Sequence, residues 1–119
     1  MKTENKIVEM SFNFALEIIG LYKKLIEHNE YVLSKQLLKS GTSIGANVEE
    51  ANAGQSKRDF IAKMAIASKE ARETRYWLKL LSRSKLVEIE YSGYLISIEH
   101  MINILTKIVK TSQESLGAK

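Results

Sequence analysis

The spacing of histidine and carboxylate residues is the first test for chemistry in this sequence. Helical proteins that bind two metal ions place Glu-x-x-His pairs on facing helices. The two histidines here, His28 and His100, are preceded three positions earlier by Leu25 and Ser97, so the motif is absent. Cysteine, the usual thiolate ligand and nucleophile, does not occur. The sequence therefore predicts no metal site and no cofactor, and we interpret both histidines as surface or turn residues.

Paired acids and nucleophilic sets are the second test. Glu70 and Glu73 are three residues apart, so they would share one side of a helix and could act on one substrate. The basic residues beside them, which favour exposed ion pairs instead, are Lys63, Lys69 and Arg72. A Ser-His-Asp set would depend on Asp59, the sole aspartate, and Gly41 to Gly45 lacks the spacing of a phosphate-binding loop. We therefore expect no enzymatic activity.

Basic residues are concentrated in one segment. Residues 57–85 hold nine basic and three acidic residues, a net charge of +6, while the rest of the chain carries −2. On a helix, five of the basic residues form one stripe roughly 21 Å long, namely Lys69, Arg72, Arg75, Lys79 and Arg83. Tyr76 lies within the stripe. A cationic stripe with an aromatic residue is typical of a surface that binds the phosphate backbone of nucleic acids, and the alternative is a solvated face without a ligand.

The opposite flank of the same helix is apolar and contains Ile66, Trp77 and Leu80. This flank is too apolar to leave in water, so it either widens the core of the chain or contacts a second chain. Tryptophan is over-represented among the residues that dominate binding at interfaces. We therefore predict a homo-oligomer with these three residues at its interface, and the internal-core alternative stays open.

Apolar residues recur with helical spacing in four segments, which must position these side chains. The predicted helices span residues 6–27, 31–52, 57–83 and 91–111. Proline is absent, so no ring interrupts a helix. Short connections, including a turn at His28-Asn29 and a polar link over 82–90, imply antiparallel neighbours. The sequence predicts an all-α, up-down-up-down four-helix bundle, a single domain over residues 1–119, with a frayed tail over 112–119.

Three local features refine this prediction. Gly41 and Gly45 lie inside the second helix, where each glycine costs about 1 kcal/mol relative to alanine, so we expect another backbone to approach there. Asn47 lies next to the apolar stripe and is expected to be a partly buried amide that bonds across helices. Ser56 is a good N-cap for the third helix, with Asp59 three positions later.

The chain has no feature of membrane insertion or export. No run of about 18 apolar residues occurs, so no transmembrane helix is expected. The first ten residues lack the apolar centre of a signal peptide. The absence of cysteine agrees with a reducing compartment, and we expect a cytoplasmic protein.

Three blocks of sequence resemble a known family. The blocks cover residues 40–51, 56–61 and 66–78, with the patterns S-I-x-x-N-x-x-E-A and E-x-x-E-T-x-x-x-L. In these blocks the chain resembles the four-helix bundle family of 23S rRNA intervening-sequence proteins. The residues that match the family's pattern, which the resemblance implies are structural, are Ser43, Ile44, Asn47, Glu50, Glu73 and Thr74.

The resemblance carries implications of its own. It implies an up-down bundle that assembles into a ring-like homopentamer with no enzymatic activity. The family is also similar to the accessory variability protein of diversity-generating retroelements, a basic pentamer that associates with nucleic acid and a reverse transcriptase. Taken with the basic stripe, we predict a non-enzymatic oligomer that binds RNA or DNA backbone. The alternative is a protein-interaction scaffold whose positive charge is incidental.

Overall fold

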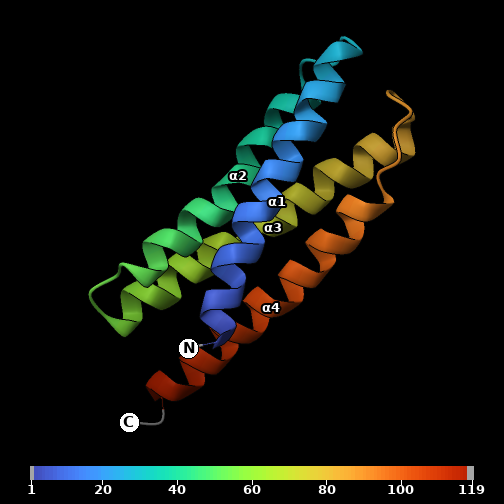
Figure 1. Ribbon diagram of the computed structural model, residues 1–119. Coiled ribbons are helices and arrows are strands. Elements are labelled where there is room, and N and C mark those ends of the chain that lie inside the picture. Colours follow the sequence, from blue (N-terminus) through green and yellow to red (C-terminus); the bar gives the residue numbers. More distant parts are fainter. Residues whose placement is uncertain (1, 118–119) are drawn as a thin grey trace.

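Four antiparallel α-helices form an elongated bundle in the computed structural model, which describes residues 2–117 and the side chains of residues 6–117 (Figure 1). The helices are α1 (Lys2–Glu27), α2 (Leu33–Asn52), α3 (Lys57–Ser84) and α4 (Ser92–Gly117). Each helix packs against the next, and a less extensive contact between α1 and α4 closes the bundle. The molecule measures 53 × 22 × 22 Å, and α1 begins at the end where α4 terminates. The predicted fold class and order of helices are confirmed.

The core consists of one apolar stripe from each helix, as the helical spacing predicts. Its largest fully buried side chains are Ile7, Ile18, Leu21, Leu25, Leu37, Ile44, Met64, Leu78, Leu81, Ile98, Met101 and Leu105. One part of the apolar surface of α1 does not enter this core. Phe12, Leu16 and Ile19 remain 61%, 54% and 38% exposed. Within one chain, α1 therefore has more apolar surface than its neighbours cover.

The predicted approach of another backbone is confirmed at Gly45, where α1 approaches, but at Gly41 the neighbour on α1 is a side chain. A Cβ atom built on Gly41 would lie 2.9 Å from Cγ2 of Ile18. A Cβ atom built on Gly45 would lie 3.4 Å from the backbone oxygen of Ser11. The lack of a side chain at Gly41 therefore allows α1 to pack closely on α2, whereas a methyl group at Gly45 would make an ordinary contact.

Two different caps begin the central helices. Ser56 begins α3 as predicted, because its Oγ accepts the backbone N–H of Asp59 at 3.1 Å. The cap of α2 was not predicted. Buried Glu30 lies before the helix, and its carboxylate accepts the backbone N–H groups of three residues, Val32, Leu33 and Ser34. This carboxylate satisfies N–H donors that a helix start leaves without intrahelical partners.

The helix ends differ in part from the prediction. The turn at Asn29, where φ is 65°, is confirmed. The predicted frayed tail is wrong for residues 112–117, because α4 continues to Gly117, and residues 118–119 lie outside the described part. Half-buried Ser112 and Leu116 extend the inward face of α4 by another turn, which explains the longer helix. The link after α3 is short and begins at Lys85, whose φ is 58°.

Candidate nucleic-acid interface

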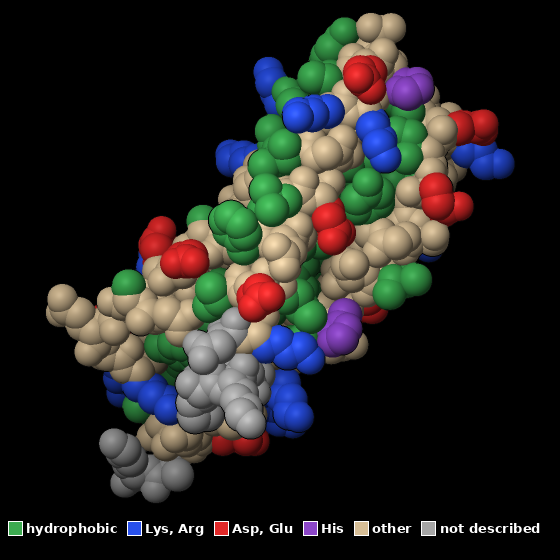
Figure 2. Space-filling model, in the orientation of Figure 1, with side chains coloured by type: hydrophobic (Ala, Val, Ile, Leu, Met, Phe, Trp, Pro, Cys, Tyr) green, Lys and Arg blue, Asp and Glu red, His purple; other side chains and the backbone are tan. Residues whose placement is uncertain are grey.

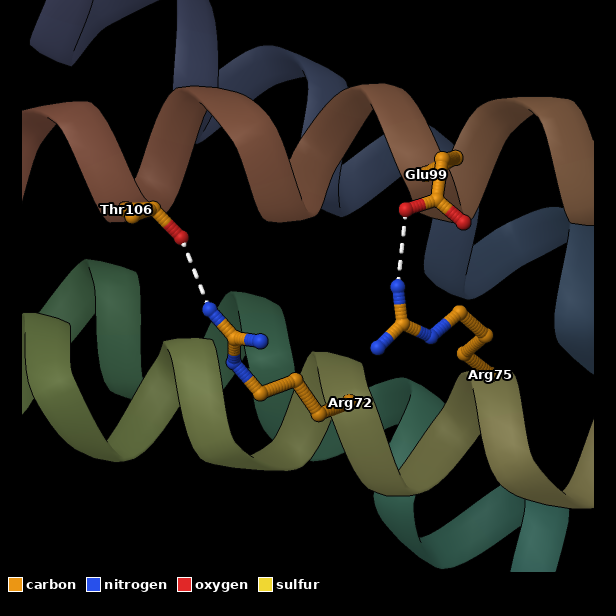
Figure 3. A network of polar contacts seen from close by, with 4 residues as sticks. All are labelled: Arg72, Arg75, Glu99 and Thr106. Atoms are coloured by element: carbon orange, nitrogen blue, oxygen red, sulfur yellow. Dashed lines mark hydrogen bonds and ion pairs between the residues drawn. The ribbon is translucent and has the colours of Figure 1, made fainter.

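Two members of the predicted basic stripe, Arg72 and Arg75, extend from α3 toward α4 (Figure 3). Nη2 of Arg72 donates a hydrogen bond to Oγ1 of Thr106 at 3.0 Å. One turn further along, Nη1 of Arg75 lies 2.7 Å from Oε1 of Glu99. Both arginines therefore reach across the groove between α3 and α4.

The members of the stripe differ in how available their charges are. Arg75 is paired with Glu99, so its charge is neutralised within the chain. Lys69, Lys79 and Arg83 are exposed. Arg72 is also exposed, and its partner Thr106 is uncharged. The structure therefore places four exposed cations without an acidic partner among the described residues, and Arg75 is the exception.

One basic residue of α4, Lys110, adds to this surface and was missed by the sequence analysis. Lys107 and Lys110 are exposed, and Lys110 borders the same hollow as Arg72. Nothing in the sequence indicated a basic residue here, because the predicted stripe lies entirely within residues 57–85 and these lysines lie outside that range. Only the pairing of α3 with α4 brings Lys110 beside Arg72.

The predicted interface flank of α3 is partly internal. Trp77 is half-buried against the core, its Nε1 donates to Oε2 of Glu73 at 3.1 Å, and its ring meets that of Tyr76 edge to face. Leu80 is also half-buried, whereas Ile66 is 41% exposed. Of the three predicted interface residues, Ile66 therefore offers the most surface to a second chain.

The ion pairs predicted for Glu70 and Glu73 are wrong. Lys63 lies 2.8 Å from Oε1 of Glu50 on α2, because its flank of α3 faces that helix. Glu73 accepts its hydrogen bond from Trp77 instead of pairing with a neighbouring cation. Among the described residues, the pairs Lys63–Glu50 and Arg75–Glu99 are the ion pairs of the bundle.

Asn47 does not bond across helices, contrary to the prediction. Its Nδ2 donates to the backbone oxygen of Ser43, one turn earlier in the same helix, at 2.9 Å. That carbonyl is the nearest acceptor for a short amide side chain. The buried polar link between α2 and α3 is instead a hydrogen bond of 2.9 Å that the Thr74 hydroxyl donates to the Ser40 hydroxyl.

Other parts of the surface offer little chemistry. Across the described residues, no three His, Cys, Asp or Glu side chains gather as they would around a metal ion. His28 and His100 are exposed, as expected of surface or turn residues. The largest hollow described is a groove of about 650 Å³ between α1 and α4, with Met10, Phe14 and Met101 among its lining residues. None of the described helices has an apolar stretch long enough to cross a membrane.

These features define an all-helical bundle protein with a basic groove on one side, and sequence comparison identifies its family. The family model for the 23S rRNA-intervening sequence protein matches residues 3–110, and the chain belongs to this family. The crystal structure of a protein of unknown function from the S23 ribosomal protein family of Bacteroides thetaiotaomicron is similar. Its identity is 45% and its TM-score 0.86, over 91% of this chain and 98% of that chain. No curated protein matches the chain.

Proposed function

We propose that the protein is a non-enzymatic, cytoplasmic homo-oligomer that binds the phosphate backbone of RNA or DNA through the groove between α3 and α4. The observation that carries the proposal is the position of the exposed cations. Arg72 on α3 and Lys110 on α4 border one hollow of this groove, and the exposed Lys69, Lys79 and Arg83 lie along the same helix as Arg72. Phosphate contacts of this kind supply affinity that does not depend on base sequence.

The expected binding is weak for one protomer and stronger for an assembly. Each neutralised phosphate contributes a salt slope of about −0.9 on duplex DNA or −0.7 on single strands. Few such contacts fit on one chain, whereas linked copies bind the same strand together and gain avidity. Tyr76 is the aromatic residue within the stripe, so base stacking adds little and sequence preference is slight.

An exposed apolar surface supports the oligomer. Figure 2 shows hydrophobic side chains in a band along α1, which contains the exposed Phe12, Leu16 and Ile19. Their spacing of four and three residues places them on one line of the helix. A soluble chain rarely leaves such a line uncovered. A second copy of the chain is its proposed partner, and the family resemblance favours a pentamer.

A salt series with paired variants tests nucleic-acid binding. Wild-type protein should retain RNA or DNA at roughly 50 mM salt and release it as salt rises. The double variant Arg72→Glu with Lys79→Glu should lose binding while its circular dichroism and molecular mass stay unchanged. Lys23→Glu with Lys24→Glu makes the same change of charge on exposed positions of α1 and should retain most of the affinity. Equal losses in both double variants, or no binding by wild type, would contradict the proposal.

Light scattering tests the oligomer. Wild-type protein should have a mass several times that of one chain at micromolar concentration, and Phe12→Ser with Leu16→Ser should lower it. A constant mass of one chain would refute the assembly. A protein-interaction scaffold is the second candidate, favoured by the same exposed line on α1. It becomes the leading function if wild type binds no polynucleotide.

A further inference from the structure

A shallow hollow of about 250 Å³ lies between α3 and α4, beside the basic stripe. Its lining residues are Ala65, Ser68, Arg72, Thr106, Val109, Lys110 and Gln113. Two of them are cations and none is an acid. We call this site the Ser68 hollow. Its charge attracts an anion, and its size allows more than one oxygen, because a water molecule in the liquid occupies about 30 Å³.

The polar groups of the Ser68 hollow are mainly hydrogen-bond donors. Arg72 gives one N–H to Thr106 and keeps the rest of its guanidinium donors. Because Oγ1 of Thr106 accepts that bond, the hydroxyl hydrogen of Thr106 is available to a ligand. Lys110 contributes an ammonium and Gln113 an amide. A group of donors without a carboxylate suits a ligand that only accepts hydrogen bonds.

Ser68 adds a hydroxyl to the lining of the hollow. Its residue is 9% exposed, and since no buried side-chain oxygen of the described residues lacks a hydrogen-bond partner, the unbonded Ser68 hydroxyl must reach the open space of the hollow. The other buried hydroxyls, those of Ser11, Ser34, Ser40 and Thr74, each bond to a backbone oxygen near them in sequence. Buried hydroxyls nearly always have a partner. The Ser68 hydroxyl differs from these in being open to the hollow, so it can bond to a ligand there or to water.

We infer that the Ser68 hollow is a seat for one phosphate group. A phosphate offers several acceptor oxygens and negative charge, which match the donors of Arg72, Thr106 and Lys110. The hollow would hold a phosphate more firmly than the open stripe does, because its donors converge on one place. The inference rests on the proposed function for the source of that phosphate, the backbone of a bound polynucleotide. A free phosphate compound is the other source of the same chemistry.

Titration with inorganic phosphate tests the seat without a polynucleotide. Amide resonances of Ser68, Thr106 and Gln113 should shift and saturate with phosphate, and they should stay unchanged with sodium chloride at equal ionic strength. Lys110→Gln should weaken the response, whereas Lys107→Gln, one turn earlier on the same helix, should preserve it. A response to both salts alike, or none to phosphate, would overturn the inference.

Two matched pairs of variants test whether a polynucleotide uses the seat. Ser68→Ala should lower affinity about tenfold, since it removes a hydrogen bond to a charged group, while Ser82→Ala on the same helix should have no effect. Lys110→Gln should lower affinity more than Lys107→Gln. Thermal melts of all four should match wild type, because none of these side chains makes an intramolecular bond in the described residues.

The outcomes separate the inference from the proposed function. In one outcome wild type binds polynucleotide, Ser68→Ala binds it equally well, and the two lysine variants lose equal affinity. The phosphate seat is then refuted, while the proposed binding through the basic groove stands. If wild type binds no polynucleotide but phosphate saturates the Ser68 hollow, the proposed function fails and the seat serves a free phosphate compound. If neither ligand binds, both fail.

Discussion

Replacing Gly41 with alanine tests whether close packing of α1 on α2 determines the stability of the bundle. The added Cβ atom would lie 2.9 Å from Cγ2, 3.1 Å from Cγ1 and 3.3 Å from Cβ of Ile18. The first two atoms move when the Ile18 side chain rotates, but Cβ of Ile18 is fixed to its backbone. Ile18 is fully buried, so the helices themselves must separate.

The magnitude follows from two opposing terms. Alanine in place of a helical glycine gains about 1 kcal/mol from helix propensity. Inserting a methyl group into a close-packed core costs about 1–3 kcal/mol. Gly20 on α1 is a matched control, because nothing lies within 4 Å of a Cβ atom built there. Gly20→Ala therefore keeps the first term alone, and the difference between the two variants isolates the cost of packing.

Urea denaturation followed by circular dichroism measures the difference at one fixed protein concentration, since oligomer stability depends on concentration. Gly20→Ala should be more stable than wild type by about 1 kcal/mol, and Gly41→Ala should be about 1–3 kcal/mol less stable than Gly20→Ala. Gly45→Ala should resemble Gly20→Ala, since its nearest atom lies at an ordinary contact distance of 3.4 Å. Equal stability of the Gly41 and Gly20 variants would refute the packing argument.

Two further predictions concern charge. Burial of Tyr91, followed by the charge of Glu30, raises the pKa of this phenol above 10.0. The folded chain then keeps a proton that the unfolded chain loses, so stability falls as pH rises above about 10, and Tyr91→Phe should show a shallower decline in alkaline melts. Glu99→Gln should free Arg75 and steepen the salt dependence of polynucleotide binding by about 0.7–0.9. Glu114→Gln makes the same change of charge on α4 and serves as the control. It should steepen the salt dependence less than Glu99→Gln does, because Glu99 acts through its 2.7 Å pair with Arg75.

The sequence predicted the core because burial on a helix is periodic and therefore local. Ile44 and Leu78 were identified from spacing alone, and both are fully buried. The glycines of α2 could be interpreted from the sequence for a related reason. A glycine inside a helix lowers its stability, so its presence indicates a compensating contact. The identity of the approaching helix, α1, was not available, because nothing in the residues near Gly41 specifies Ile18 as the neighbour.

The errors arose where a side chain had a choice of partner. Asn47 bonds to the carbonyl one turn before it, and the cross-helix link passes through Thr74 instead. Lys63 forms an ion pair with Glu50 on α2 and not with the nearby acidic residues of its own helix. Arg75 met Glu99, 24 residues further along the chain. Local spacing describes which face a side chain occupies, but its partner depends on how the helices pair.

The separation of surfaces in the bundle makes the two proposed activities compatible. The exposed apolar line lies on α1, whereas the cations lie on α3 and α4, and α1 packs on α2 and α4 rather than on α3. A second copy that covers Phe12 and Leu16 would therefore leave the α3 bank of the groove open. Each added copy would then bring another set of cations to one strand, so affinity would rise with assembly although no single contact became stronger. Loss of assembly should accordingly weaken binding without changing which residues of α3 contact phosphate.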